Sequence, residues 1–133
     1  MNMIETDWWE MGLPEEWDAE QDDETILVMD EDGIGAIEIS VLEKDNAADA
    51  VDWSAMISDM APDNVKPVVT KLAEREARYV SFIDEEDAVR LWLVDGPGII
   101  LVVSYVCDVS DRGMDDSAVD EILSTLAFVS REQ

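Results

Sequence analysis

Residues 77–107 read ARYVSFIDEEDAVRLWLVDGPGIILVVSYVC, and this stretch decides the fold class. It contains three apolar runs, at 77–83, 88–94 and 99–107, separated by an acidic segment and by Gly96-Pro97-Gly98. Glycine and proline in a short connection favour a reversal of the chain. The first run alternates in polarity, whereas the third is apolar at successive positions, which is typical of a central strand covered on both faces. The stretch therefore predicts three antiparallel strands.

The residues upstream extend this pattern. Leu13-Pro14 leads into a short strand at Trp17, because proline is tolerated where a strand begins. The runs 25–30 and 36–42 flank an acidic turn that contains glycine, at 30–33. Two such runs joined by such a turn predict a β-hairpin.

Two segments are predicted helices, and one is ambiguous. Asn46 can cap a helix over 47–60, whose apolar residues recur every three or four positions, and a second helix is predicted over 115–127. The segment 68–76 begins with β-branched residues, which favour a strand, but the helix formers after them leave a short helix as the alternative.

The order of these elements predicts an α+β domain, with helices packed on the faces of a mostly antiparallel sheet. Residues 13–133 are assigned to one such domain, because the length is close to the usual size of a single domain. Residues 1–12 show no clear period and are interpreted as an N-terminal arm, flexible or partly ordered.

Short motifs spread over 13–129 resemble the PsbP-like superfamily, and within it small bacterial proteins of unknown function. They are Leu13-Pro14-x-x-Trp17, the turn at 30–33, Leu91-Trp92-Leu93, the run from Ile100 to Tyr105, and Ala118-x-x-x-Ile122-Leu123-x-x-Leu126-x-Phe128. The resemblance implies an αβα sandwich built on a single antiparallel sheet. It also points to assembly or binding proteins, because the relatives of this superfamily include an extrinsic photosystem II subunit and a Ran-binding nuclear import factor. No functional residue of the family maps onto this sequence.

Composition excludes several classes of function. The chain has 34 Asp and Glu against 8 Lys and Arg, no His, and a formal net charge of −26, although 47% of its residues are apolar. Without His, neither a Ser-His-Asp nor a Cys-His nucleophile can form. The one cysteine, Cys107, excludes an internal disulfide. Nucleic acid and anionic membranes are disfavoured partners, because both are negatively charged. No secretory signal is visible, so a cytoplasmic location is expected.

The charge is unevenly distributed along the chain. No Lys or Arg precedes Lys44, whereas that stretch holds 15 acidic residues. Five of the eight basic residues then follow in one segment: Lys66, Lys71, Arg75, Arg78 and Arg90. They either offset the repulsion of the acidic first third or, around Arg75 and Arg78, form a small patch that binds an anionic partner.

No motif indicates a catalytic, cofactor or metal site. Asp30-x-Asp32-Gly33 resembles part of a calcium loop, but Val28 and Ile39 then fall where ligands are needed. Cys107 has no His or Lys near it in sequence and is interpreted as buried. The best interaction candidates are Trp8 and Trp9, which either fold back on the domain or dock on a partner or a second copy in a homodimer.

The function predicted from these features is that of a non-enzymatic protein-binding domain with a basic protein partner, immunity- or adaptor-like, and without a cofactor. Two alternatives remain open. The chain could be a small-ligand-binding or carboxylate-based catalytic domain, or a stand-alone domain whose acidity serves solubility or adaptation to salt.

Overall fold

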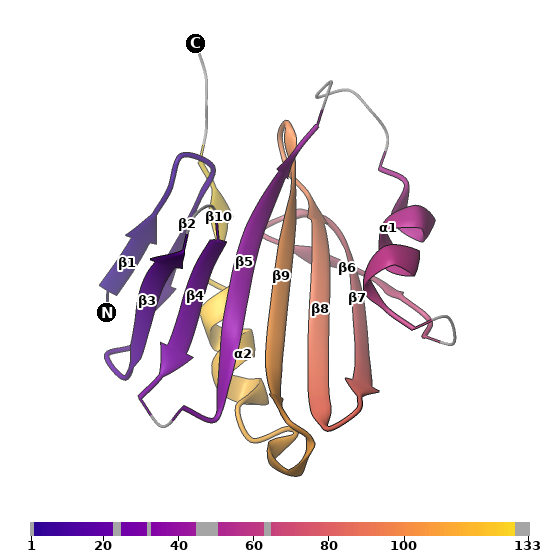
Figure 1. The fold of residues 1–133 in the computed structure, drawn as a ribbon. Coiled ribbons are helices and arrows are strands. Elements are labelled where there is room, and N and C mark those ends of the chain that lie inside the picture. The colour runs from indigo at the N-terminus through magenta and orange to yellow at the C-terminus, as the bar shows by residue number, and fades with distance from the viewer. Residues whose placement is uncertain (1, 23–24, 32, 45–50, 63–64, 130–133) are drawn as a thin grey trace.

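The computed structural model describes residues 2–22, 25–31, 33–44, 51–62 and 65–129 (Figure 1). These residues form a seven-stranded sheet in which every neighbouring pair of strands is antiparallel. In spatial order its strands are β3 (Trp17–Asp22), β4 (Thr25–Asp30), β5 (Gly35–Glu43), β9 (Ile99–Asp108), β8 (Asp87–Asp95), β7 (Arg75–Asp84) and β6 (Val68–Leu72). The α+β class and the mostly antiparallel sheet are confirmed, as are the three strands of 77–107.

A second, three-stranded sheet contains the residues that were interpreted as an N-terminal arm. Its order is β1 (Asn2–Glu5), β2 (Trp9–Leu13) and β10 (Ala127–Phe128). The hairpin β1–β2 forms because Trp9, Met11 and Leu13 alternate along β2 and all three are buried. Residues 2–13 are therefore part of the folded structure and contribute to its core.

Both helices are shorter than predicted. Helix α1 (Trp53–Met60) begins after Asp52, whose side chain accepts a hydrogen bond from the Ala55 amide at 3.1 Å. The predicted cap Asn46 and residues 47–50 lie outside the described residues. Helix α2 (Asp116–Leu123) follows a short 3-10 helix, η1 (Val109–Asp111), and ends before the chain extends into β10.

The ambiguous segment 68–76 is a strand followed by a turn. Strand β6 ends at Leu72, and Ala73 and Glu74 then adopt left-handed φ values of 55° and 65°. Strand β7 begins at Arg75, so the last two residues of the predicted segment belong to the next strand. The short-helix alternative is wrong.

The core lies on both faces of the large sheet, because strand residues alternate between them. On one face, Trp92 and Val94 of β8 join a cluster with the buried residues of β2 and with Val119 of α2. On the other face, Leu91 and Leu93 join a smaller cluster with Ile57 of α1. Figure 1 shows α2 near the small sheet and α1 near β6 and β7, at the other end.

Strand β9 is central in the sheet, as its uniform polarity predicts, but its two faces are not equally covered. Leu101, Val103 and Tyr105 are buried, whereas Val102 and Val106 on the opposite face are only half-buried. These two side chains line an open groove of about 410 Å³ that also contains Glu38. One face of β9 is therefore fully covered, whereas the face with Val102 and Val106 is covered only in part.

Candidate functional site

A groove of about 770 Å³ lies between the β1–β2 turn and one end of β3, β4 and β5. We call it the N-terminal groove. Its apolar lining includes Ile4, Trp8, Ile26, Val41 and Leu42. Exposed acidic residues line it on two sides, with Glu5 and Asp7 on the side of the β1–β2 turn and Glu43 at the end of β5. The site thus combines apolar and negatively charged groups, which suits a ligand with both apolar and cationic parts.

The wall of the groove is held in place by Thr6. The Thr6 Oγ1 atom accepts hydrogen bonds from the Trp8 amide at 3.1 Å and the Trp9 amide at 2.9 Å, and it is 2.9 Å from the Trp9 carbonyl, to which it donates. On the other side of the turn, the Val129 amide donates to the Trp8 carbonyl at 3.0 Å. The backbone that carries Asp7 and Trp8 is therefore fixed from both sides.

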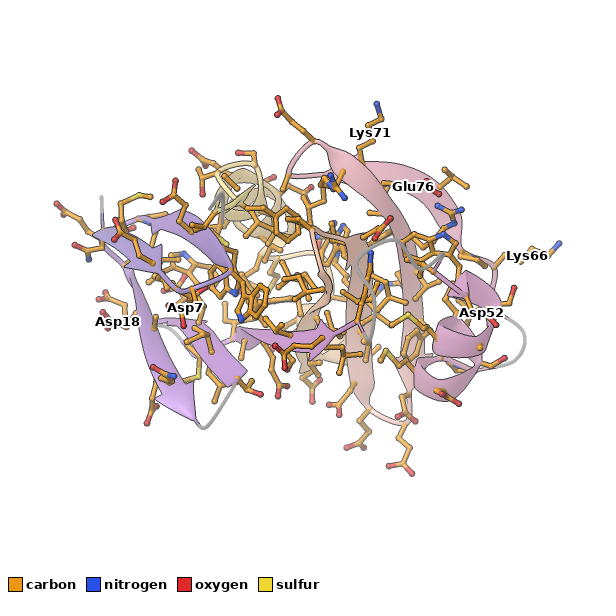
Figure 2. All side chains as sticks on the ribbon, turned by 90° about the horizontal axis from the view of Figure 1, so that it is seen from above. Asp7, Asp18, Asp52, Lys66, Lys71 and Glu76 are labelled. Atoms are coloured by element: carbon orange, nitrogen blue, oxygen red, sulfur yellow. The ribbon has the colours of Figure 1, made fainter. Side chains whose placement is uncertain are left out.

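Among the described residues, no cation pairs with the carboxylates of the groove. Glu5, Asp7 and Glu43 take part in none of the ion pairs between described residues. The nearest basic residue in sequence, Lys44, forms its ion pair with Asp95 and hydrogen bonds the Gly96 carbonyl instead. In Figure 2, Asp7 and Asp18 lie at one end of the molecule, whereas Lys66 lies at the other.

The two adjacent tryptophans have different surroundings. Trp9 is 1% exposed and belongs to the main core, so it folds back on its own domain, which is the first of the two predicted alternatives. Trp8 is half-buried, packs against that core and lines the N-terminal groove. Docking of Trp8 on a partner or a second copy stays a prediction. The two side chains differ because Trp9 points to the same face of β2 as the buried Met11 and Leu13, whereas Trp8 precedes the strand.

Arg75 and Arg78 do not form a common patch. They are three residues apart on β7, so their side chains leave opposite faces of the sheet. The Arg75 Nε atom donates to the Asp95 carbonyl at 2.8 Å, although the side chain is exposed. The Arg78 guanidinium is 2.9 Å from a Glu76 carboxylate oxygen and lies over the Trp53 ring at 4.6 Å. Their contribution to partner binding stays a prediction.

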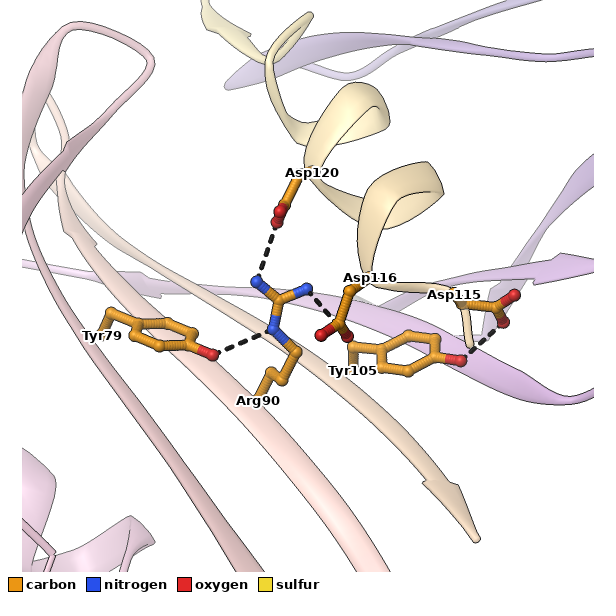
Figure 3. Close-up of polar contacts among 6 residues, drawn as sticks. All are labelled: Tyr79, Arg90, Tyr105, Asp115, Asp116 and Asp120. Atoms are coloured by element: carbon orange, nitrogen blue, oxygen red, sulfur yellow. Dashed lines mark hydrogen bonds and ion pairs between the residues drawn. The ribbon is translucent and has the colours of Figure 1, made fainter. Parts of the chain in front are cut away.

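A polar cluster around Arg90 joins β8 to α2 (Figure 3). Arg90 donates to the Tyr79 hydroxyl at 3.0 Å and to Asp120 at 2.8 Å, and its guanidinium is 3.5 Å from Asp116. It also lies over the Trp92 ring at 4.6 Å. Burial alone would lower the pKa of Arg90, but the hydrogen bonds to Tyr79 and Asp120 raise it. Because two carboxylates already neutralise this cation, the cluster fixes the helix and offers little to an anionic ligand.

A second polar contact beneath α2 is buried. The Tyr105 hydroxyl donates to Asp115 at 2.6 Å, and Asp115 is only 8% exposed. Burial and this hydrogen bond raise the pKa of Tyr105. The nearby Cys107 thiol also has a raised pKa, chiefly because it is buried. A thiol that keeps its proton is a weak nucleophile, which agrees with Cys107 as a packing residue.

Sequence reasoning did not find either cluster. Asp116 and Asp120 are one helical turn apart and therefore share a face of α2, but only the fold shows that Arg90 lies opposite them. In the described ranges, no three His, Cys, Asp or Glu side chains are placed to hold a metal ion. None of the helices in those ranges is long and apolar enough to cross a bilayer.

No protein-family model matches the chain, and no curated protein matches its sequence. Several solved structures have the same fold. A protein from Bacteroides thetaiotaomicron is 20% identical with a TM-score of 0.71, over 95% of this chain. The match covers 47% of that protein, so the chain spans about half of its length.

Two further structures match over most of both chains. Cyanobacterial PsbP (CyanoP) from Synechocystis is 9% identical, with a TM-score of 0.68, over 96% of this chain and 92% of its own. A protein of unknown function from Pseudomonas aeruginosa is 12% identical, with a TM-score of 0.55, over 88% of this chain and 99% of its own. At these identities the likeness concerns the fold. The chain therefore has a PsbP-like fold, as its sequence motifs suggest.

Proposed function

We propose that this chain is a non-enzymatic, adaptor- or immunity-like binding domain whose N-terminal end binds a basic surface of a partner protein. One observation carries the proposal: the carboxylates of the N-terminal groove have no cation among the described residues, and they surround apolar side chains that contact water. Carboxylates that line the same groove repel one another, and a positively charged partner relieves that repulsion.

The contacts of the basic residues also favour a basic partner over an anionic one. Arg78 and Arg90 are each paired with carboxylates and stacked on aromatic rings, and Lys44 is paired with Asp95. These cations are less available to an anionic partner than the carboxylates of the N-terminal groove are to a basic one. A field of one sign also steers an oppositely charged partner and raises its association rate, an effect that salt screens.

The test uses a labelled octalysine peptide and fluorescence anisotropy, at about 20 mM and about 300 mM NaCl. We expect binding at low salt and at least about tenfold weaker binding at high salt. The decisive variant is Glu5→Gln/Asp7→Asn/Glu43→Gln, and its matched control is Asp84→Asn/Glu85→Gln/Glu86→Gln, which removes three charges from the β7–β8 turn.

Binding through the N-terminal end predicts a clear loss of affinity in the first variant and a smaller loss in the control. Equal losses would contradict the proposal, because the peptide would then respond only to net charge. Failure to bind at low salt would contradict it as well. Binding that survives in both variants and in high salt would favour the small-ligand alternative.

A further inference from the structure

We infer that the N-terminal groove holds an extended segment of the partner that presents both Lys or Arg and apolar side chains to it. The inference rests on the proposed function and names the chemistry of its ligand. Three properties of the groove support it: exposed apolar lining, acidic residues on two sides, and outer strands beside it whose outer edges pair with no other described strand.

The apolar lining is accessible to solvent. Leu42 is 44% exposed, and Ile4, Trp8 and Val41 are half-buried. All four line one groove of about 770 Å³, which is within the size range of ligand sites. Apolar side chains of a ligand would gain free energy by covering this surface, whereas a purely charged ligand would leave it in water.

The charges of the groove fit a cation placed between its walls. Glu5 and Asp7 approach from the β1–β2 turn and Glu43 from the end of β5. A Lys or Arg side chain in this space would contact carboxylates on two sides together with the Trp8 ring, and a tryptophan ring attracts cations. The long methylene stem of either side chain also packs well on apolar surface.

The strands beside the groove favour an extended ligand. β1 is the outer strand of the small sheet and β3 is the outer strand of the large sheet, so along one edge neither pairs with another described strand. Both contribute to the groove, through Ile4 and Glu5 of β1 and Ala19 of β3. An extended segment can hydrogen bond such an edge, and the alternate side chains that then point to the groove would include both Lys or Arg and apolar residues.

The experiment compares two hexapeptides of equal charge, Lys-Lys-Leu-Leu-Lys-Lys (the Lys-Leu peptide) and Lys-Lys-Ser-Ser-Lys-Lys, by titration calorimetry and by NMR of the labelled full chain. We expect the Lys-Leu peptide to bind at least about tenfold more tightly and to shift the Trp8 indole signal and amides of β1 and β3. The preference should be lost in Trp8→Ala, but kept in the control Met3→Ala, because Met3 is 54% exposed on β1 and does not line the groove.

Circular dichroism checks that Trp8→Ala folds, and Leu42→Ser, at a more exposed site, provides a second test if it does not. Equal affinities for the two peptides, or a preference that survives both substitutions, would overturn the inference. In that case salt-dependent binding of octalysine, reduced by the Glu5/Asp7/Glu43 variant, would still support the proposed function. If octalysine also fails to bind, both proposals fall.

Discussion

The two ends of this molecule differ in how their charged side chains are paired. Around β6 to β8 and α2, arginines contact carboxylates, carbonyl oxygens and aromatic rings, and Arg90 uses such contacts to join helix to sheet. Around β1 to β5, carboxylates line an open groove without an ion pair among the described residues. Residues 1–43 hold 15 acidic and no basic residues and so contribute more than half of the net charge of −26, whereas around Arg90 the charge is partly neutralised where it contributes to the fold.

The largest expected effect tests whether the acidic end is part of the core. Trp9→Ala removes a tryptophan that is 1% exposed and should lower the free energy of unfolding by about 3–5 kcal/mol. Urea denaturation measures the change. Met3→Ala, in the same hairpin but exposed, serves as the control and should cost far less. Similar values for the two variants would mean that residues 2–13 behave as an arm after all.

At the other end, Arg90→Met should destabilise the protein by about 1–3 kcal/mol, because it leaves Asp116 and Asp120 without their cation close to the sheet. The value is below that for a fully buried pair, since both carboxylates remain half-exposed or more. Arg75→Met is the control, because Arg75 is exposed and hydrogen bonds only a carbonyl. An unchanged midpoint of thermal unfolding for Arg90→Met would show that the cluster does not hold α2.

Tyr105→Phe should cost about 1–2 kcal/mol, because buried Asp115 loses its hydrogen-bond donor. The same hydroxyl contributes a pH dependence. Folding raises the pKa of Tyr105, so its contribution is complete below the ordinary tyrosine pKa of about 10 and is lost as the pH rises above it. Urea midpoints should therefore fall less steeply above about pH 10 in the variant. Identical slopes would contradict the assignment.

The smallest effects should differ in sign between the two ends. Asp120→Asn removes a partner of Arg90 and should cost a few tenths of a kcal/mol to about 1 kcal/mol. Asp7→Asn removes a charge that has no ion pair with any described residue, and it should leave stability unchanged or raise it slightly, most clearly at low salt. Differential scanning calorimetry at two salt concentrations measures both. A loss of stability in Asp7→Asn would contradict the difference in charge pairing between the two ends.

What could be predicted from the sequence was local. The strands of 77–107 follow from alternation and short turns, because neighbours in this part of the sheet are also neighbours along the chain. The turn at Ala73 and Glu74 was missed because glycine usually marks a left-handed conformation, and neither residue is glycine.

What was missed depends on contacts between distant residues. Strand β10 pairs with β2 across more than a hundred residues, so residues 1–12 alone gave no sign of a sheet. The Arg90 cluster depends in the same way on α2 lying opposite β8. The acidic first third was visible in the sequence, but the N-terminal groove that collects its carboxylates was not, since β1, β3 and β5 meet only in the fold. The difference between Trp8 and Trp9, in contrast, could have been found from the alternation of Trp9, Met11 and Leu13.

The pairing of β2 with β10 has a consequence for folding kinetics. Trp9 is in register with Phe128, and the Gly12 amide donates to Thr125 Oγ1 at 2.8 Å. Contacts so distant in sequence close a very long loop and slow the search for the native state. The strands of 77–107 can pair early through short turns, whereas the small sheet has to wait for residues 125–128. The wall that carries Trp8 should therefore be among the last parts of the protein to form, and the groove would be complete only when the chain has folded throughout.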